Sequence, residues 1–550
     1  MYRNILLLAL TGVALTCCKP TERTASKVPA PKTEEQGDAA ESAVGTPIAT
    51  FLRGADEAEQ VMVEPAPAPA PAPAPAAPTP AAAVDLASSL LSIALTVQDY
   101  NRVMPWEKKQ ASGTRLNGVY LGDGRVLTLG SSMALANYVE ISLPDSSKTV
   151  PARVLRYDAD LNLALLTVVN EEDAAIFETR TPLALGPALE RTGRADLLCT
   201  HNGTQSAAIP LEGEVGTAEK GLPRLQMRAE QAVPGNYSHG APIVADGKLV
   251  GLSAGYNAAS RQLKVINGEL LARFLNADEN APTGVPQMGV SMAELTDPVF
   301  RRYLKLSDAQ TGVYLCEVEP MGAAAAAGLQ KGDVLTSVEG MPVDNRGRCE
   351  LPTYGLLDVS TVVRYLKPLG ESVRLTYSRD GQEHETTMPL NRDAEEKALI
   401  RTEKADEAPR YLVWGGLVFQ PLTNNYLEAL KAEAKALPTE FMQLRDQEDE
   451  LRKRGFRELT ALTLVVPTKA TLGYDTCTFC LVEKVNGQEP HTFEEFVSLL
   501  TSPTESGMVE LSINKSPYRI YMESAAAEAA NDELRRAGII RLQRLTSQED

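Results

Sequence analysis

Short apolar runs separated by turn sequences fill the chain from about residue 85 to residue 278. Typical runs are GVYLGDGRVLTLG, DLNLALLTVV and GKLVGLSAGY, and Asp-Gly or Gly-Asp pairs separate their strand-like halves. Many short strands at close spacing, with few stretches of helical periodicity, predict an all-β domain of barrel or sandwich type.

The pattern changes after this region. Residues 312–343, GVYLCEVEPMGAAAAAGLQKGDVLTSVEGMPV, predict a strand, the start of an Ala-rich helix, a Gly-containing turn and another strand. Residues 411–427 read as strands, and helix-like YLEALKAEAKAL follows them. These segments predict mixed α and β structure in the C-terminal half.

The first 84 residues lack such patterns. Residues 1–18 have Arg3 before a short apolar run and end at Cys17 and Cys18. This arrangement predicts a signal peptide of lipoprotein type with Cys18, or alternatively Cys17, as the lipid acceptor; an ordinary secretory signal is the alternative. Residues 19–84 are polar and then Ala/Pro-rich, which predicts a disordered, extended tether.

Composition excludes some functions. The chain has 550 residues, enough for several domains, and a formal net charge of -18, so a nucleic-acid partner is not expected. Five cysteines follow the N-terminal pair: Cys199, Cys316, Cys349, Cys477 and Cys480. The last two have CxxC spacing, but they lie in a segment that reads as one strand, so we interpret them as buried apolar residues. The histidines are not spaced to complete a zinc site, and we expect no metal or other cofactor.

The order of three segments resembles the trypsin-like domain of HtrA/Deg proteases. GVYLGDGRVLTLG, DADLNLALLTV and the PGNYSHGAPIV segment fall where that family carries His, Asp and Ser. Residues 312–343 resemble the family's PDZ signature, and residues 411–427 with the segments after them resemble the second PDZ region of plant-type Deg proteases. The resemblance implies a mainly β chain in which a trypsin-like double β-barrel is followed by two PDZ-like α+β domains. It places the protease domain at 85–282 and the PDZ-like domains at 283–395 and 408–546.

The matched catalytic positions depart from the family pattern. Ser131 stands at the base position, Asn162 at the carboxylate position, and Ser238 and His239 fall in the nucleophile loop, which carries two extra residues. No histidine precedes His201, so another alignment does not recover the base. A triad needs a base, an orienting carboxylate and a nucleophile. We therefore predict a degenerate site with no confident catalytic residue. New pairs, Ser238 with His239 or Cys199 with His201, are the less favoured alternative.

The first PDZ-like domain supplies the candidate binding residues. QMGVSM lies where the family binds peptide carboxylates, which points to Met288, Gly289, Val290 and Ser291. The predicted protein is a catalytically inactive HtrA/Deg-like envelope protein that binds peptide or unfolded segments of other proteins. We expect it to be lipid-anchored, to face the periplasm or exterior, and by resemblance to form a trimer-based homo-oligomer. The alternatives are an active serine endopeptidase with a rearranged site and a chaperone-like holdase.

Overall fold

The computed structural model describes residues 86–547, except residues 145–146, 202–204, 215, 220, 234–238, 279–280, 435–436 and 438. The predicted signal peptide, tether, Cys17 and Cys18 lie outside the described residues, as does Ser238. The longest described helix, α8, has 15 residues, and no described helix combines the length and apolarity needed to cross a membrane.

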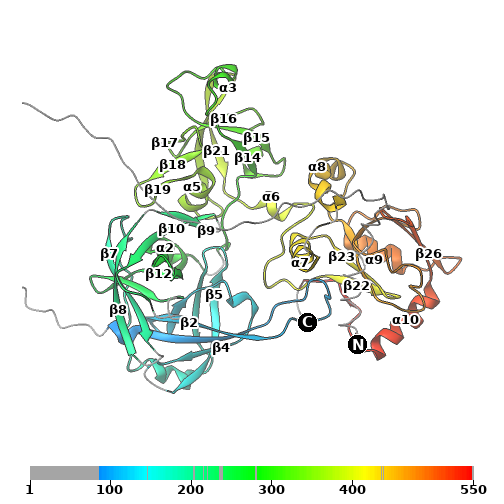
Figure 1. Cartoon of the computed structure of the whole chain (residues 1–550), viewed down its shortest axis with the longest axis horizontal. Helices are drawn as coiled ribbons and strands as arrows, with labels where there is room; N and C mark the ends of the chain where they lie inside the picture. Colours follow the sequence, from blue (N-terminus) through cyan, green and yellow to red (C-terminus); the bar gives the residue numbers. More distant parts are fainter. Residues whose placement is uncertain are drawn as a thin grey trace, which may run out of the picture. The chain divides into compact units, whose positions relative to one another are not determined.

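The first domain begins with a closed β-barrel (Figure 1). Its strands are β1 (Leu90–Val97), β2 (Ser112–Gly122), β3 (Arg125–Thr128), β4 (Ala136–Ser142), β5 (Thr149–Asp158) and β6 (Leu163–Val168), in the order β1-β2-β3-β6-β5-β4. Short 3-10 turns cover Leu86–Ser89, Met133–Leu135 and Glu171–Phe177. The β2–β3 hairpin turns at Asp123 and Gly124, which have φ values of 51° and 70°. Positive φ at both positions is what a two-residue hairpin matching the twist of its strands requires.

A second barrel follows directly. It contains β7 (Arg194–His201), β8 (Gln205–Gly213), β9 (Thr217–Glu219), β10 (Leu222–Ala229), β11 (Pro242–Ala245), β12 (Lys248–Asn257) and β13 (Gln262–Asn267). The sheet order is β13-β12-β11-β7-β8-β10-β9, and pairing of β10 with β13 closes it. Helix α2 (Gly268–Asn276) ends the domain, and the Asn267 side chain caps it by accepting the N–H of Gly268. The expected double barrel is confirmed.

The third domain is a sheet with helices. Its elements are β14 (Val290–Ala293), α3 (Pro298–Tyr303), β15 (Val313–Val318), α4 (Ala323–Ala326), β16 (Val334–Val338), β17 (Met341–Pro342), β18 (Arg348–Leu351), β19 (Gly355–Asp358), α5 (Val359–Leu366), β20 (Ser372–Arg379) and β21 (Gln382–Pro389). The main sheet runs β14-β15-β16-β20-β21. Apolar residues of α5 share one buried cluster with Leu225 and Met227 of β10, so this domain packs on the second barrel through a common core.

The fourth domain repeats this plan with additions. After α6 (Asp393–Glu396) come β22 (Tyr411–Trp414), β23 (Leu417–Pro421), α7 (Asn424–Ala434), α8 (Thr439–Lys453), β24 (Thr460–Val465), β25 (Cys480–Val485), α9 (Phe493–Thr501), β26 (Met508–Ile513), β27 (Arg519–Glu523), α10 (Ser524–Arg536) and β28 (Gln543–Arg544). The sheet order is β27-β26-β25-β24-β23-β22-β28. The mainly β fold class, with two α+β domains after the barrels, is therefore confirmed.

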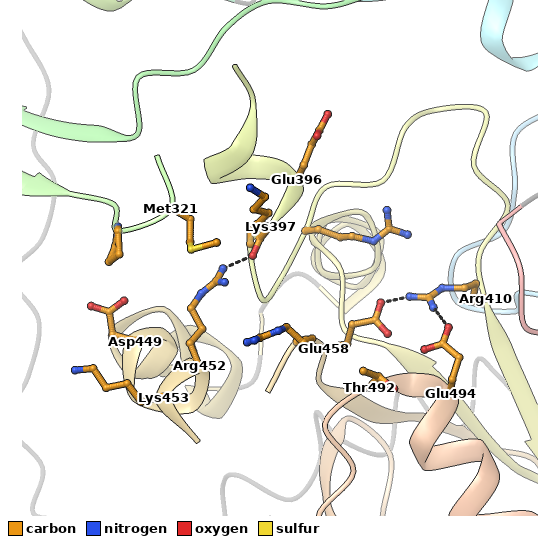
Figure 2. A pocket seen from close by; sticks show the side chains of 14 residues that line it. Met321, Glu396, Lys397, Arg410, Asp449, Arg452, Lys453, Glu458, Thr492 and Glu494 are labelled. Carbon is orange, nitrogen blue, oxygen red and sulfur yellow. Dashed lines mark hydrogen bonds and ion pairs between the residues drawn. The ribbon is translucent and has the colours of Figure 1, made fainter. Parts of the chain in front are cut away.

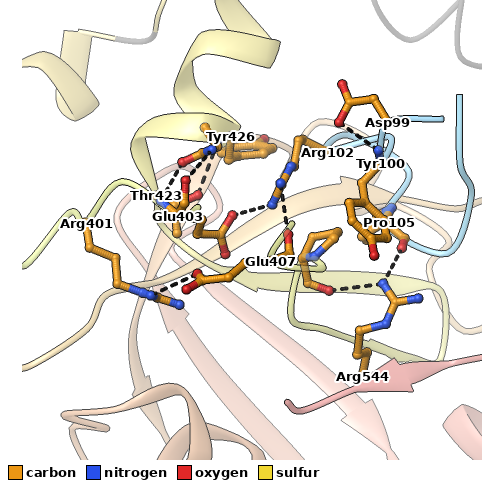
Figure 3. A network of polar contacts seen from close by, with 12 residues as sticks. Asp99, Tyr100, Arg102, Pro105, Arg401, Glu403, Glu407, Thr423, Tyr426 and Arg544 are labelled. Carbon is orange, nitrogen blue, oxygen red and sulfur yellow. Dashed lines mark hydrogen bonds and ion pairs between the residues drawn. The ribbon is translucent and has the colours of Figure 1, made fainter. Parts of the chain in front are cut away.

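A polar network joins the loop after β1 to the segment before β22 (Figure 3). Arg102 Nη1 lies 2.5 Å from Glu403 Oε2, and Arg102 Nη2 donates to the Glu407 carbonyl at 2.9 Å. Arg544 of β28 donates to the carbonyl of Pro105 at 3.3 Å. These contacts tie the first barrel to the fourth domain.

Candidate functional site

Ser131 and Asn162, which the sequence aligns with the base and carboxylate positions of the HtrA/Deg family, lie side by side. Strand β3 ends at Thr128, and Gly130 packs so closely on β6 that a Cβ there would lie 2.3 Å from the Leu163 carbonyl oxygen. This approach brings Ser131 beside Asn162, and the backbone N–H of Ser131 donates to Asn162 Oδ1 at 2.8 Å. The contact joins main chain to side chain, and the Ser131 side chain is exposed.

Asn162 lies in the turn between β5 and β6, with a φ of 62°. Asp160 and Asn162 do not share a strand face, because β5 ends at Asp158 and β6 begins only at Leu163. The Asp160 carboxylate has other partners: its Oδ2 accepts the N–H of Val285 at 3.1 Å and Arg392 Nη1 at 2.6 Å. The carboxylate nearest in sequence to Asn162 is thus bonded to the first PDZ-like domain and the segment after it.

This pair cannot perform the usual proton transfer. A serine hydroxyl is not a base near neutral pH, and a neutral amide cannot stabilise an imidazolium as a carboxylate does. In trypsin-like serine proteases, replacing the triad Asp by Asn lowers turnover by about 10⁴-fold.

The loop of the third position is fixed to the first barrel. The carbonyl of His239 accepts Asn117 N–H at 2.8 Å and Asn117 Nδ2 at 3.1 Å. Thr128 Oγ1 donates to the Asn117 carbonyl at 2.6 Å, which links this loop to the strand that leads to Ser131. The His239 side chain is exposed. Residues 234–238, which include Ser238, lie outside the described residues.

Cys199 is poorly suited to act as a nucleophile. It lies in β7 with no exposed surface, and burial raises the pKa of its thiol to about 11. The thiolate is the reactive form, so little of it exists near neutral pH. The side chain of His201, its suggested partner, lies outside the described residues.

The CxxC segment is not a single strand. Cys477 precedes β25, which begins at Cys480, so the strand expected to contain both is shorter than predicted. Both cysteines are buried, as expected, and Cys480 Sγ donates to the Cys477 carbonyl at 3.0 Å. All five cysteines in the described part of the chain are free, and no group of His, Cys, Asp and Glu there is arranged to hold a metal ion.

The four predicted peptide-binding residues form a loop and the start of an edge strand. Gly289 has a φ of 70° and lies against Gly322, so a Cβ there would approach the Gly322 Cα within 2.9 Å. The carbonyls of Met288 and Gly289 accept N–H groups of the β15–α4 segment. Neither Met288 nor Gly289 donates its own N–H to another described residue. Val290 and Ser291 open β14, which among the described strands pairs only with β15.

The guanidinium of Arg364 lies next to this loop. Arg364 of α5 donates from Nη2 to Gln287 Oε1 at 2.5 Å, and Gln287 directly precedes Met288. Free backbone N–H groups, an unpaired strand edge and a nearby guanidinium are the features by which a PDZ-type groove binds a peptide C-terminus.

The fourth domain has a counterpart of this loop that the sequence reading missed. Gly415 and Gly416, with φ values of 66° and 106°, precede β23 as Gly289 precedes β14. The Gly-Gly pair after an apolar run was the available signal. Here the loop is already occupied: the Gly415 N–H donates to Asn531 Oδ1 at 2.9 Å, and its carbonyl accepts Thr468 Oγ1 at 2.8 Å.

A cavity of about 830 Å³ lies between the Pro320–Met321 turn and the fourth domain (Figure 2). Its lining is highly charged, and several of its charged side chains are paired. Arg410 bonds to Glu458 and Glu494, Arg452 pairs with Glu448, and Lys397 pairs with Asp393.

Comparisons with known proteins agree with this architecture. A family model described as PDZ domain matches residues 286–390, and a second model with the same description matches residues 400–544. These matches show two PDZ domains after the trypsin-like double barrel. The chain as a whole is similar to HtrA/Deg-type proteases that carry PDZ domains.

The relatives come from plants and bacteria. The putative mitochondrial protease Do-like 3 of Arabidopsis thaliana is 22% identical over 432 residues, which cover 76% of this chain and 73% of the relative. The serine protease Do-like HtrA of Lactobacillus helveticus is 25% identical over 289 residues, covering 49% of this chain and 65% of the relative. Among solved structures, the HtrA-type protease AlgW with decapeptide aligns with a TM-score of 0.40 and 18% identity, over 56% of this chain and 96% of that one.

Proposed function

We propose that this chain is a catalytically inactive HtrA/Deg-type protein that binds peptide segments of other proteins through its first PDZ domain. The observation that carries the proposal is the contact between Ser131 and Asn162. The positions for base and carboxylate meet, but they present a hydroxyl and an amide. The free N–H groups at Met288 and Gly289 and the open edge of β14 support peptide binding.

The cellular setting is part of the same proposal. The N-terminal residues read as a lipoprotein-type signal followed by a long tether, which supports an anchor at Cys18 or Cys17 in the bacterial envelope. A trimer-based homo-oligomer follows from the resemblance to HtrA proteases. Clients would be unfolded or C-terminal segments, which suits a role in protein quality control.

Proteolysis is tested with unfolded casein and a fluorophosphonate probe. The full chain is compared with Ser238→Ala and His239→Ala variants. We expect neither cleavage nor labelling. Cleavage that disappears in either variant would mean that the loop has rebuilt an active site, and the chain would then be an endopeptidase. Cleavage equal in all three proteins would point to a contaminating protease.

Peptide binding is tested with a fluorescein-labelled peptide that ends in valine with a free carboxylate, and with its C-terminally amidated form. We expect only the free carboxylate to bind. Gly289→Ala should weaken binding by about tenfold, because the added Cβ displaces the loop. Gly328→Ala is the matched control: Gly328 also has positive φ, at 81°, but no atom lies within 4 Å of its added Cβ. Suppression of casein aggregation without carboxylate-dependent binding would favour a holdase.

A further inference from the structure

The sheets of the two PDZ domains have the same strand order. In the first, β14, β15, β16, β20 and β21 pair in that order; in the second, β23, β24, β25, β26 and β27 do the same. Helix α5 precedes β20, and α9 precedes β26. Strand β23 therefore corresponds to β14, the strand beside which a peptide would add, and α9 corresponds to α5.

The edge that is free in the first domain is covered in the second. Strand β22 pairs antiparallel with β23, with Trp414 opposite Leu417 and Leu412 opposite Phe419. Only Gly415 and Gly416 separate the two strands, and the positive φ of both suits a tight hairpin. Strand β28 then pairs with the outer side of β22.

The direction of β22 matches that of a bound peptide. A PDZ ligand lies antiparallel to the groove strand and ends at the carboxylate-binding loop. Strand β22 is antiparallel to β23 and ends at Trp414, directly before Gly415. The chain continues where a ligand would present its carboxylate, and the Gly415 N–H bonds to Asn531 instead.

The side chains of β22 also occupy the positions of ligand side chains. Alternate residues of a strand face the same side, so Leu412 and Trp414 point together. Both belong to the buried cluster that contains Phe493, Phe496 and Val497 of α9. All four residues of β22 are buried, whereas no residue of β14 is.

We propose that residues 411–414 are a built-in ligand of the second PDZ domain, which closes its peptide site, so that one copy of the chain binds one peptide, at β14. The expected ratio of one peptide per chain rests on the proposed peptide-binding function of the first PDZ domain. The closure of the second PDZ site does not depend on that function. The second domain then serves to hold the fold together, through β28, Arg544 and the loop after β1.

Two measurements test this proposal. The full chain is titrated with the free-carboxylate valine peptide, and amide hydrogen exchange is followed over residues 411–421 with and without that peptide. We expect saturation at one peptide per chain, uniformly weaker binding in Gly289→Ala with no component of wild-type affinity, and slow exchange in β22 that the peptide leaves unchanged. Saturation at two peptides, a component of wild-type affinity that persists in that variant, or faster exchange of β22 on adding peptide would each overturn the proposal.

The exchange experiment separates this inference from the proposed function. If the wild-type chain binds no peptide, the function of β14 fails, yet slow exchange in β22 would still support the built-in ligand and fast exchange would refute it. Asn531→Ala adds a variant that leaves the strands intact but frees the Gly415 N–H. This variant should increase the exchange rate at Gly415 severalfold and leave the slow exchange of β24, another strand of the same sheet, unchanged. An unaltered rate at Gly415 would contradict the role given to Asn531.

Discussion

Arg102 and Glu403 form a buried ion pair across 301 residues of chain, with Arg102 Nη1 lying 2.5 Å from Glu403 Oε2. Burial raises the pKa of the Glu403 carboxyl, and the charge of Arg102 opposes that rise. Arg102→Ala would leave a buried acid without its partner, so we expect the free energy of unfolding to fall by about 3–5 kcal/mol. Urea denaturation of the full chain measures the loss.

The matched control is the double variant Arg102→Met with Glu403→Met. Replacing both charges by apolar side chains of similar length removes the cost of an unpaired buried charge, so most of the lost stability should return. A double variant as unstable as Arg102→Ala would show that the guanidinium acts mainly through its second bond, to the Glu407 carbonyl.

Gly240 is predicted to be intolerant of any side chain. Its φ is 75°, and an added Cβ would lie 2.5 Å from the carbonyl oxygen of Asn117. Gly247 has nearly the same φ, 72°, with nothing within 4 Å. Gly240→Ala should therefore destabilise the protein by about 1–3 kcal/mol more than Gly247→Ala, because only the first must displace backbone. Thermal or urea unfolding of both variants measures the difference, and equal losses would mean that backbone strain alone decides both.

The buried thiols should resist alkylation. Burial raises the thiol pKa to about 11 for Cys199 and to about 12 for Cys349 and Cys480. In iodoacetamide near pH 8, peptide mass spectrometry should find the half-buried Cys316 modified well before these three. In urea all should react alike. Rapid modification of Cys199 in the native protein would contradict its described burial.

Glu339 should contribute stability that acid removes. The backbone N–H of Arg374 and then the ammonium of Lys367 hold the pKa of this carboxyl below its ordinary value. A carboxyl with a depressed native pKa stabilises the fold above its unfolded pKa and loses that contribution as pH falls through the native pKa. Wild type should therefore be more stable than Glu339→Gln near neutral pH, and the difference should shrink as pH falls below about 4 and vanish once pH is below the lowered native pKa.

The control for this prediction is Glu383→Gln. Glu383 is an exposed carboxylate of β21 that forms no ion pair with a described residue. Its substitution should give no pH-dependent difference in urea denaturation. A difference at Glu383 as large as that at Glu339 would assign the effect to net charge and not to the contacts of Glu339.

The sequence predicts the fold class well because its signals are local. Asp-Gly turns and alternating apolar residues define the barrels, and the Ala-rich segment before Gly328 marks the first PDZ domain. The turn that contains Asn162 was missed, since DLNLALLTVV reads as one apolar run; in the structure Asn162 has a φ of 62°. The pattern of apolar and polar residues around Arg102 and Glu403 does not indicate that they pair, so only the structure reveals this contact.

Strand β22 also affects the tendency of this protein to aggregate. An unpaired sheet edge can accept a strand from another chain and so begin edge-to-edge aggregation. By covering β23, the chain removes this hazard from the groove strand of the second PDZ domain, whereas β14, the groove strand of the first, remains an edge. During refolding at high concentration, unwanted strand exchange between copies should therefore begin at β14, and a peptide that binds there should suppress it.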